Sequence, residues 1–286
     1  IGLNPQINYN NLTDWVLPSF MFLPSTTTAI SSDYSVDTDL KEGEFSIFST
    51  LTYYSQATAG TDWTDNDRWG LTPTTPCGTC QPTSLDNVVI QAGHTVTNTS
   101  NFSVNELDIK DGATLDLSGM SYSITTFTAS DGNSTLRIGS DLSIPSITNI
   151  GTYGNGTDKV VFYGINYDIP RTLNGSTNFW NLEIEDDKIL QSGGGSLIDN
   201  NFKVVSGSFI LQNDNFSIAN DFIVELGGSF DAADVVFNAN TNGSGTNIIN
   251  GVFTDTNAND TNTFRGNITV GTSGTFNSSS ELIIDQ

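Results

Sequence analysis

The feature that most constrains this fold is a repeat of 19 to 20 residues, in which apolar residues return at equivalent positions along the chain. A period near twenty is too short for a repeat of two helices, whereas it fits a single coil of a β-solenoid. Residues that alternate between apolar and polar types form strands with one buried face. The two clearest apolar columns are Leu182, Phe202 and Phe222, and, two residues further on, Ile184, Val204 and Val224.

Glycines return with the same period and predict the corners of the coils. The segment 107–117 contains a short apolar strand, an Asp-Gly turn and a second short strand, and 202–211 and 222–231 repeat this arrangement. Glycine suits such corners because it adopts positive φ angles without a steric penalty. The predicted turn positions, which include the single histidine of the chain, are Gly93, His94, Gly112, Gly132, Gly207 and Gly227.

These patterns predict an all-β chain whose main part is a parallel β-helix of roughly ten coils. The chain shows no sustained helical periodicity. In-register stacking would place Asn200 over Asn220, which predicts an amide ladder at that position. An array of β-sandwiches is the alternative, because an isolated strand–turn–strand unit also fits a meander. The constant step of 19 to 20 residues favours the coils of a solenoid over an array of sandwiches.

Three regions are expected along the chain. Residues 1–60 lack the repeat and are interpreted as a small separate β module or the tail of a preceding domain. Residues 61–84, which contain two Trp and several Pro, are expected to form a lead-in and N-terminal cap, and 85–286 the solenoid. Because the last segment is apolar and no polar cap follows it, we expect the solenoid to continue beyond this chain. The first residue, Ile1, likewise indicates a processed or excised segment.

The composition narrows the class of partners. Only 14% of the residues are charged, yet the net charge is −23, so binding to nucleic acid or to anionic lipid is disfavoured. No run of about eighteen apolar residues exists, and therefore no membrane-spanning helix is expected. The abundance of Asn, Thr, Ser and Gly suits an extracellular all-β stalk better than a cytosolic enzyme.

The two cysteines, Cys77 and Cys80, lie in a Pro-Cys-Gly-Thr-Cys loop. Zinc would need two further ligands, and the chain offers no other cysteine and only His94 as a histidine. A thioredoxin-like redox site would require a βαβ context, which is absent. A local disulfide in an oxidising compartment is the favoured interpretation, with free thiols and redox catalysis as the alternatives.

Other residues admit a catalytic and a structural interpretation. His94 is either a general base or a turn residue, and no Ser/His/Asp arrangement can be argued around it. Glu183 and Glu185 alternate with apolar residues and so point outward from the same strand, as a pair of carboxylates in a glycoside-cleaving enzyme would. The chain has only nine basic residues, scattered along it, so a solvated face is preferred.

Calcium is the one cofactor with any support in the sequence. Asp65 and Asp67 offer suitable oxygen donors, and so does the Asn-rich segment 238–243. Neither is an EF-hand, because the twelfth position would be Pro76 in the first case and Ile249 in the second. No other cofactor is expected.

The lead-in and first coils resemble the start of repetitive β-helical modules in large secreted surface proteins of Bacteroidota, which the type IX system exports and which include gliding-motility adhesins. The resemblance covers about residues 63–140, with 105–119 similar to the next coil of such modules. It implies a structural turn role for His94. No type IX export domain is recognisable here. The residues that carry the resemblance are Trp63, Trp69, Pro82, Asp86, Asn87, Val88, Val89, Ile90, Gly93, His94, Thr95, Val96 and Thr97.

Pattern and resemblance together predict a non-enzymatic, extracellular module of a cell-surface adhesin or filament that serves gliding motility or surface attachment. Its expected partners are neighbouring modules of the same long chain, further copies of itself, the export machinery, and glycans or surfaces contacted by loops 238–247 and 255–263. One alternative is a filament subunit whose uncapped end pairs with residues 1–60 of the next copy. The other is a polysaccharide-active β-helix enzyme.

Overall fold

The computed structural model of the chain divides into two units, Ile1–Leu51 and Thr52–Gln286. The expected N-terminal module, apart from its last residues, lies outside the described part of the chain. The residues that the structure describes are 50–57, 61–118, 120–129, 132–139, 157–164, 171–174, 178–192, 196–212, 215–233, 235–256 and 260–285.

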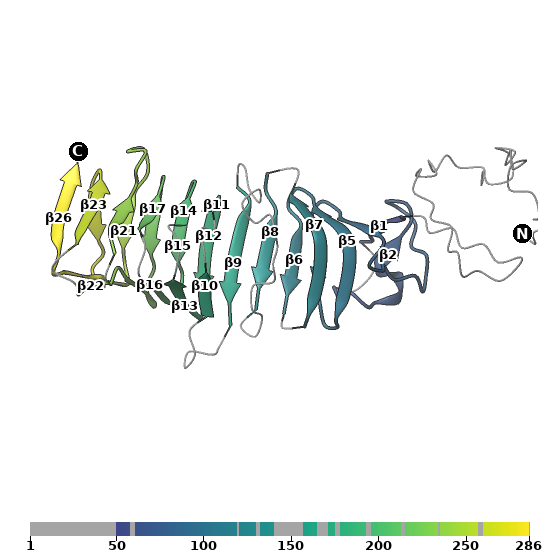
Figure 1. Cartoon of the computed structure of the whole chain (residues 1–286). Coiled ribbons are helices and arrows are strands. Elements are labelled where there is room, and N and C mark those ends of the chain that lie inside the picture. Colours follow the sequence, from purple (N-terminus) through teal and green to yellow (C-terminus); the bar gives the residue numbers. More distant parts are fainter. Residues whose placement is uncertain are drawn as a thin grey trace, which may run out of the picture. The chain divides into compact units, whose positions relative to one another are not determined.

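The second unit is a parallel β-solenoid, which confirms the predicted fold class (Figure 1). Its described residues form four sheets, and every strand pairing is parallel except that of β1 with β2. The only helical element among them is the short 3-10 turn η2 (Asn66–Arg68). Sheet 1 consists, in spatial order, of β2 (Trp69–Gly70), β1 (Thr52–Ser55), β3 (Asn87–Ile90), β5 (Phe102–Ile109) and β7 (Tyr122–Ala129).

Sheet 2 is the longest sheet and contains nine strands, each from a different coil. From the C-terminal to the N-terminal end, these are β24 (Ile268–Val270), β21 (Asn247–Ile249), β18 (Phe222–Val224), β15 (Phe202–Val204), β12 (Asn181–Glu185), β9 (Lys159–Tyr163), β8 (Thr135–Ile138), β6 (Thr114–Leu117) and β4 (Thr95–Thr97).

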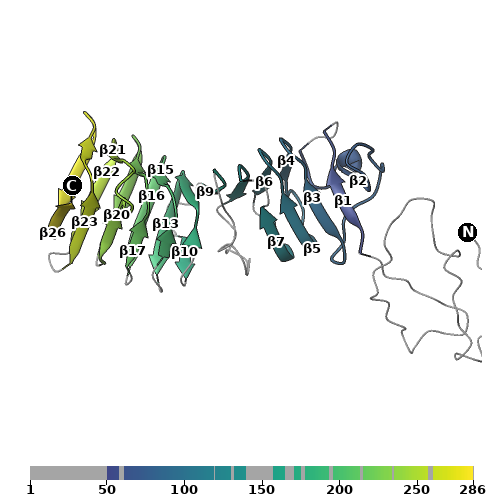
Figure 2. The same cartoon turned by 90° about the horizontal axis from the view of Figure 1, so that it is seen from above.

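Two six-stranded sheets complete the C-terminal coils, so that each of these coils has three sides (Figure 2). Sheet 3 contains β10 (Arg171–Asn174), β13 (Asp187–Ser192), β16 (Gly207–Gln212), β19 (Gly228–Asp231), β22 (Val252–Asp255) and β25 (Thr275–Ser278). Sheet 4 contains β11 (Asn178–Phe179), β14 (Ser196–Ile198), β17 (Phe216–Ile218), β20 (Phe237–Ala239), β23 (Thr261–Arg265) and β26 (Glu281–Asp285).

The register of the strands follows the repeat in the sequence. Leu182 pairs with Phe202 and Phe202 with Phe222, and two residues further Ile184, Val204 and Val224 pair in the same way. All six side chains are buried. Where the repeat slips in phase, the coils are longer, because Leu136 pairs with Val160 and Phe222 with Asn247.

Phenylalanine rings fill the interior of the C-terminal coils. In one column, consecutive rings are nearly parallel, with interplanar angles of 9°, 12° and 8° and centroids 5.8, 5.7 and 4.7 Å apart. Stacked rings add attraction beyond the burial of their area. This column consists of Phe209, Phe230, Phe253 and Phe276.

Asparagines stack at one corner, as the sequence predicts. Asn200 Nδ2 donates to Asn181 Oδ1 at 2.9 Å, and Asn220 Nδ2 donates to Asn200 Oδ1. The column continues to Asn242, whose Nδ2 lies 3.4 Å from Asn220 Oδ1. Each amide thus satisfies its neighbour in the next coil, as in stacked cross-β arrangements.

The first strand of the solenoid lies before the lead-in. Strand β1 falls within the residues 1–60 that the sequence assigns to a separate module, yet Tyr53 pairs in parallel with Val88 of β3. Residues 61–84 are therefore a long insertion between two neighbouring strands of sheet 1. The solenoid accordingly includes residues that precede 85, the position expected for its start.

Candidate functional site

Charged side chains gather on the outer face of sheet 2. Arg137 Nη2 donates to Glu185 Oε2 at 2.7 Å, and Lys159 Nζ donates to Glu183 Oε2 at 2.8 Å. Alternate residues of a strand share a face, so the stacking of coils brings together side chains that are far apart in the sequence. This charged face consists of Asp116, Arg137, Lys159, Tyr163, Glu183, Glu185, Lys203 and Glu225.

Arg137 holds the centre of the charged face. Its guanidinium carbon lies 4.6 Å from the centre of the Tyr163 ring, and its Nε lies 3.8 Å from Asp116 Oδ2. Burial by itself would lower the pKa of Arg137, but the hydrogen bond and charge of Glu185, with the charges of Asp116 and Tyr163, raise it. The guanidinium is therefore held as a cation between carboxylates of two other coils.

The two glutamates proposed from the sequence as a carboxylate pair are thus engaged in ion pairs. A third pair follows, in which Lys203 Nζ lies 3.1 Å from Glu225 Oε1. Hydrogen bonds from Asn250 and Lys203 lower the pKa of Glu225. A glycosidase needs one carboxyl group with a raised pKa as its general acid, and Glu225 shows the opposite shift. This face is a ladder of ion pairs across coils.

The lead-in covers the N-terminal edge of sheet 2. Trp63 N donates to Thr97 O at 2.8 Å, and Thr97 N donates to Thr61 O at 2.7 Å. Trp69 is fully buried, and its Nε1 donates to Trp63 O at 2.8 Å. The two tryptophans that carry the family resemblance therefore pack together, with ring centroids 4.6 Å apart. Their role is to close this end of the core.

A buried arginine ties the lead-in to the first two coils. Arg68 is 3% exposed, and it donates through Nη1 to Gln56 O at 2.9 Å and through Nη2 to Thr95 O at 2.6 Å. Burial lowers the pKa of Arg68, while the charges of Asp65 and Asp62 act in the opposite direction. The sequence gives no sign of this role, because the position is unremarkable in a polar loop.

His94 lies at the corner between β3 and β4, next to Gly93 with its φ of 73°. Its Nδ1 lies 2.8 Å from Ser55 Oγ, and Ser55 also accepts a hydrogen bond from Gln91 N at 2.9 Å. Ser55 is fully buried, so a substrate has no access to its hydroxyl group. The pair joins β1 to the next coil, and it does not resemble an accessible nucleophile with its base.

The remaining candidate residues occupy structural positions. Cys77 and Cys80 are joined by the predicted disulfide. Asp65 Oδ2 accepts a hydrogen bond from Asp62 N at 3.2 Å, and Asp67 lies in η2. Within the described ranges, no group of three or more His, Cys, Asp or Glu side chains is arranged to hold a metal ion.

The predicted turn glycines all have φ angles in the left-handed region, and Gly207 among them is the first residue of β16. Asn240, which the sequence placed in a loop with calcium-type donors, is also a corner residue with a φ of 55°. It is fully buried, and its side chain bonds to Gly245 N and O and to Arg265 O. The φ angles of the predicted turn glycines are 73° at Gly93, 67° at Gly112, 87° at Gly132, 83° at Gly207 and 97° at Gly227.

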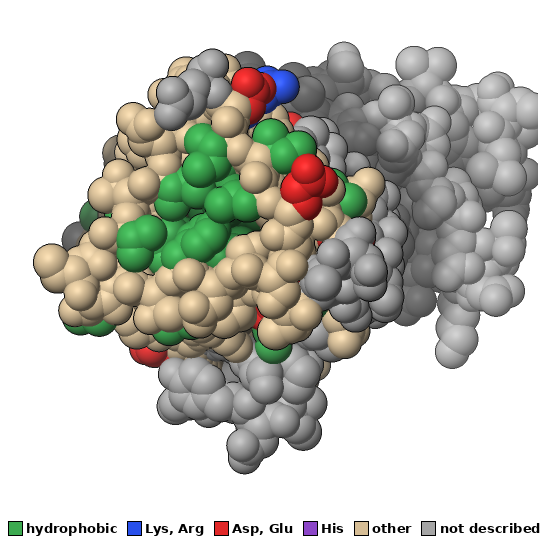
Figure 3. All heavy atoms as spheres, turned by 90° about the vertical axis from the view of Figure 1, so that its left-hand side faces the viewer, with side chains coloured by type: hydrophobic (Ala, Val, Ile, Leu, Met, Phe, Trp, Pro, Cys, Tyr) green, Lys and Arg blue, Asp and Glu red, His purple; other side chains and the backbone are tan. Residues whose placement is uncertain are grey.

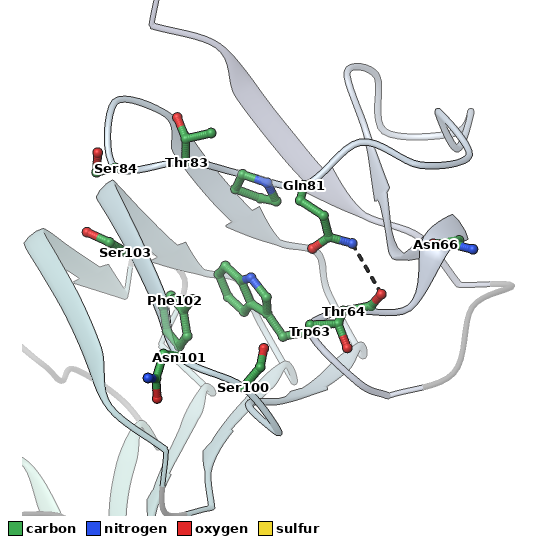
Figure 4. Close-up of a pocket in the computed structure, with 11 residues that line it drawn as sticks. Trp63, Thr64, Asn66, Gln81, Thr83, Ser84, Ser100, Asn101, Phe102 and Ser103 are labelled. Carbon is green, nitrogen blue, oxygen red and sulfur yellow. Dashed lines mark hydrogen bonds between the residues drawn. The ribbon is translucent and has the colours of Figure 1, made fainter.

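A cavity of about 540 Å³ lies where the lead-in meets the first residues of β5 (Figure 4). Trp63 and Phe102 form its apolar part, with ring centroids 3.8 Å apart and planes 16° from parallel. Pro82 adds to the apolar part, and hydroxyl and amide groups form the rest of the lining. We call this cavity the lead-in pocket; its lining residues are Trp63, Thr64, Asn66, Gln81, Pro82, Thr83, Ser84, Ser100, Asn101, Phe102 and Ser103.

Hydrogen bonds fix the walls of the lead-in pocket. Gln81 Nε2 donates to Thr64 O at 3.2 Å, as Figure 4 shows. Thr83 donates to Asp86 Oδ2 through both its backbone N and its Oγ1, at 2.8 and 2.7 Å. Asn101 Oδ1 accepts from Ser121 N at 3.1 Å. This pocket could not be predicted from the sequence, because three separate segments of the chain build it.

Comparison with known protein families, with curated proteins and with solved structures finds no match to this chain. Among the residues that the structure describes, no helix is long and apolar enough to cross a membrane.

Proposed function

We propose that this chain is a non-enzymatic structural and adhesive module of a large extracellular adhesin or filament on the cell surface. The observation that carries the proposal is the unbroken in-register stacking of sheet 2 over nine coils. Parallel strands joined coil to coil, around stacked rings, resist extension because many backbone hydrogen bonds share the load.

Two further features support this role. The Cys77–Cys80 disulfide suits an oxidising, extracellular compartment. The acidic groups of the charged face are paired with cations, which favours a stabilising function over catalysis. Export by the type IX system and a part in gliding or surface attachment rest on the resemblance of residues 63–140 alone, and belong to the proposal.

Electron microscopy of the native protein at its source, combined with the mass of the intact chain, tests the proposal. Thin surface fibres made of a chain of many hundreds of residues are the expected result. A small discrete protein that is released in soluble form would contradict it. A second assay incubates the purified chain with a panel of polysaccharides, and a loss of polymer length would support the β-helix enzyme instead.

One observation favours end-to-end assembly as a second function. Figure 3 shows apolar side chains gathered on the end of the solenoid formed by the last coil. Leu282 and Ile284 of β26 are in register with the inward residues Asn262 and Phe264, yet they are 38% and 47% exposed. Strands β24, β25 and β26 each form the edge of a sheet there, and open edges favour the addition of strands.

A further inference from the structure

We propose that the lead-in pocket binds an uncharged saccharide unit. This inference goes beyond the mechanical role and does not depend on it, since the pocket lies at the capped end of the solenoid, whereas loop 238–247 lies between β20 and β21 in the C-terminal coils. Its volume of about 540 Å³ falls within the range of about 300 to 1,000 Å³ that is typical of small-molecule sites.

The pocket is neutral although the chain is strongly acidic. None of its eleven lining residues carries an ionisable side chain, whereas the net charge of the chain is −23. An anionic ligand would be repelled by the field of the chain, and a cationic ligand would find no carboxylate in the pocket to pair with. These observations leave uncharged, hydrogen-bonding molecules as the class that fits.

The pocket also offers hydrogen-bonding groups that the fold does not use. The side chains of Asn66, Ser84, Ser100 and Ser103 make no hydrogen bond within the described part of the chain. Their positions around one cavity suit a ligand with several hydroxyl groups, because each hydroxyl both donates and accepts.

Trp63 provides the strongest single indication. The residue as a whole is 2% exposed, yet its indole Nε1 is not one of the buried polar atoms, and it donates to no acceptor among the residues described. Figure 4 shows this nitrogen on the ring edge that faces the loop of Gln81 and Thr83. An indole N–H that is open to a pocket is free to donate to an acceptor there. A hydroxyl oxygen of a ligand in the pocket would supply one.

The amphipathic lining matches a sugar ring better than it matches other polar molecules. A pyranose presents C–H groups on its faces and hydroxyls around its rim. The hydroxyl and amide groups of the pocket are suited to the rim, whereas Trp63 and Phe102, which stack on each other, offer only a small apolar surface to the C–H groups. Because Trp63 and Phe102 are only 2% and 8% exposed, hydrogen bonds rather than ring stacking would set the selectivity.

Saturation-transfer NMR and titration calorimetry on the whole chain test this assignment. The probes are the methyl glycosides of glucose, galactose, mannose and N-acetylglucosamine, their short oligomers, glucuronate, and a neutral Ser/Thr-rich peptide. Saturable binding of at least one neutral sugar is expected. Absence of binding to every neutral sugar, or tighter binding of glucuronate or of the peptide, would overturn the proposal without touching the mechanical role.

Variants at exposed positions locate the binding. Ser84→Trp fills the rim of the pocket and should abolish binding, and Asn66→Ala removes one hydrogen bond and should weaken it about three- to tenfold. Ser273→Trp and Asn277→Ala make the same changes at exposed positions of the last coil and should leave it unchanged. Unaltered affinity in both pocket variants, with each chain shown to be folded by circular dichroism, would refute the site.

Discussion

Arg137 and Glu185 are 48 residues apart in the sequence, yet Arg137 Nη2 donates to Glu185 Oε2 at 2.7 Å across the outer face of sheet 2. The two residues lie on β8 and β12, with the strand β9 between them. Val161 of β9 pairs with Arg137 on one side and with Glu183 on the other, so it faces outward, and it is nevertheless fully buried. The ion pair therefore spans one coil and joins its two neighbours over an apolar residue.

Removal of this pair should weaken the contact between coils. Arg137→Met leaves Glu185 without its cation, and we expect the free energy of unfolding to fall by about 1 kcal/mol, because both side chains are still about a quarter exposed and water screens the pair. Urea denaturation of Arg137→Met, Glu185→Gln and the double variant yields the coupling energy. Lys110→Met is the control, because it removes the ion pair of Lys110 with Asp108, which lies within one coil and does not join two coils. A coupling energy of zero would contradict the prediction.

Truncation of a ring in the central column should cost far more. Phe230 is fully buried and stacks on Phe209 and Phe253, so Phe230→Ala opens a cavity and is expected to destabilise the solenoid by about 3 to 5 kcal/mol. Phe276→Ala is the matched control in the same column. Phe276 has a stacking partner on one side only among the described residues, so its loss should cost less. Equal losses of stability, measured by urea denaturation, would show that the end coil is packed as tightly as the middle.

The fold was predictable from the sequence because each structural requirement recurs at a fixed step. The columns headed by Leu182 and Ile184 and the turn at Gly207 are visible as repeats. Gly251 is different: a Cβ atom there would lie 2.2 Å from Gly228 O, so the close approach of two coils requires glycine. The phase of the repeat slips before this residue, and no local pattern identifies it.

The candidate sites were far less predictable, since they depend on which coils become neighbours. Glu183 was identified from strand alternation, whereas its partner Lys159 belongs to a coil whose length departs from the repeat. Ser55 lies before the lead-in, and its contact with His94 exists only because β1 joins the solenoid. The lead-in pocket likewise depends on how the irregular segment 61–84 folds back on β5.

Protonation of His94 should destabilise the N-terminal end of the solenoid. Burial, and then the charge of Arg68, lower the pKa of His94 from its usual value of 6.5, against the opposite effect of its hydrogen bond with Ser55. Above pH 6.5 the imidazole is neutral in both folded and unfolded chains and contributes nothing to the pH dependence. Below this pH the unfolded chain binds the proton first, so stability falls until the folded pKa is passed.

Melting temperatures of the wild type and of His94→Gln between pH 7.5 and pH 5 measure this contribution. The wild type should lose stability relative to the variant as the pH falls through the lower part of this range. Carboxylates titrate in both proteins, so the difference between the two curves isolates the histidine. A constant difference over the whole range would contradict the lowered pKa.

The exposed end of the solenoid offers the sharpest test of association between copies. Ile284 continues an inward column, whereas its neighbour Ile283 pairs with Thr263 on the outer face, and the two are 47% and 42% exposed. If copies join through this end, the mass in sedimentation should rise with concentration. Ile284→Glu would place a charge inside the junction and abolish the rise, because an unpaired charge is costly to bury. Ile283→Glu adds the same charge at nearly the same exposure but outside the junction, and should preserve association. Equal loss in both variants would show that net charge, rather than the apolar end, governs the assembly.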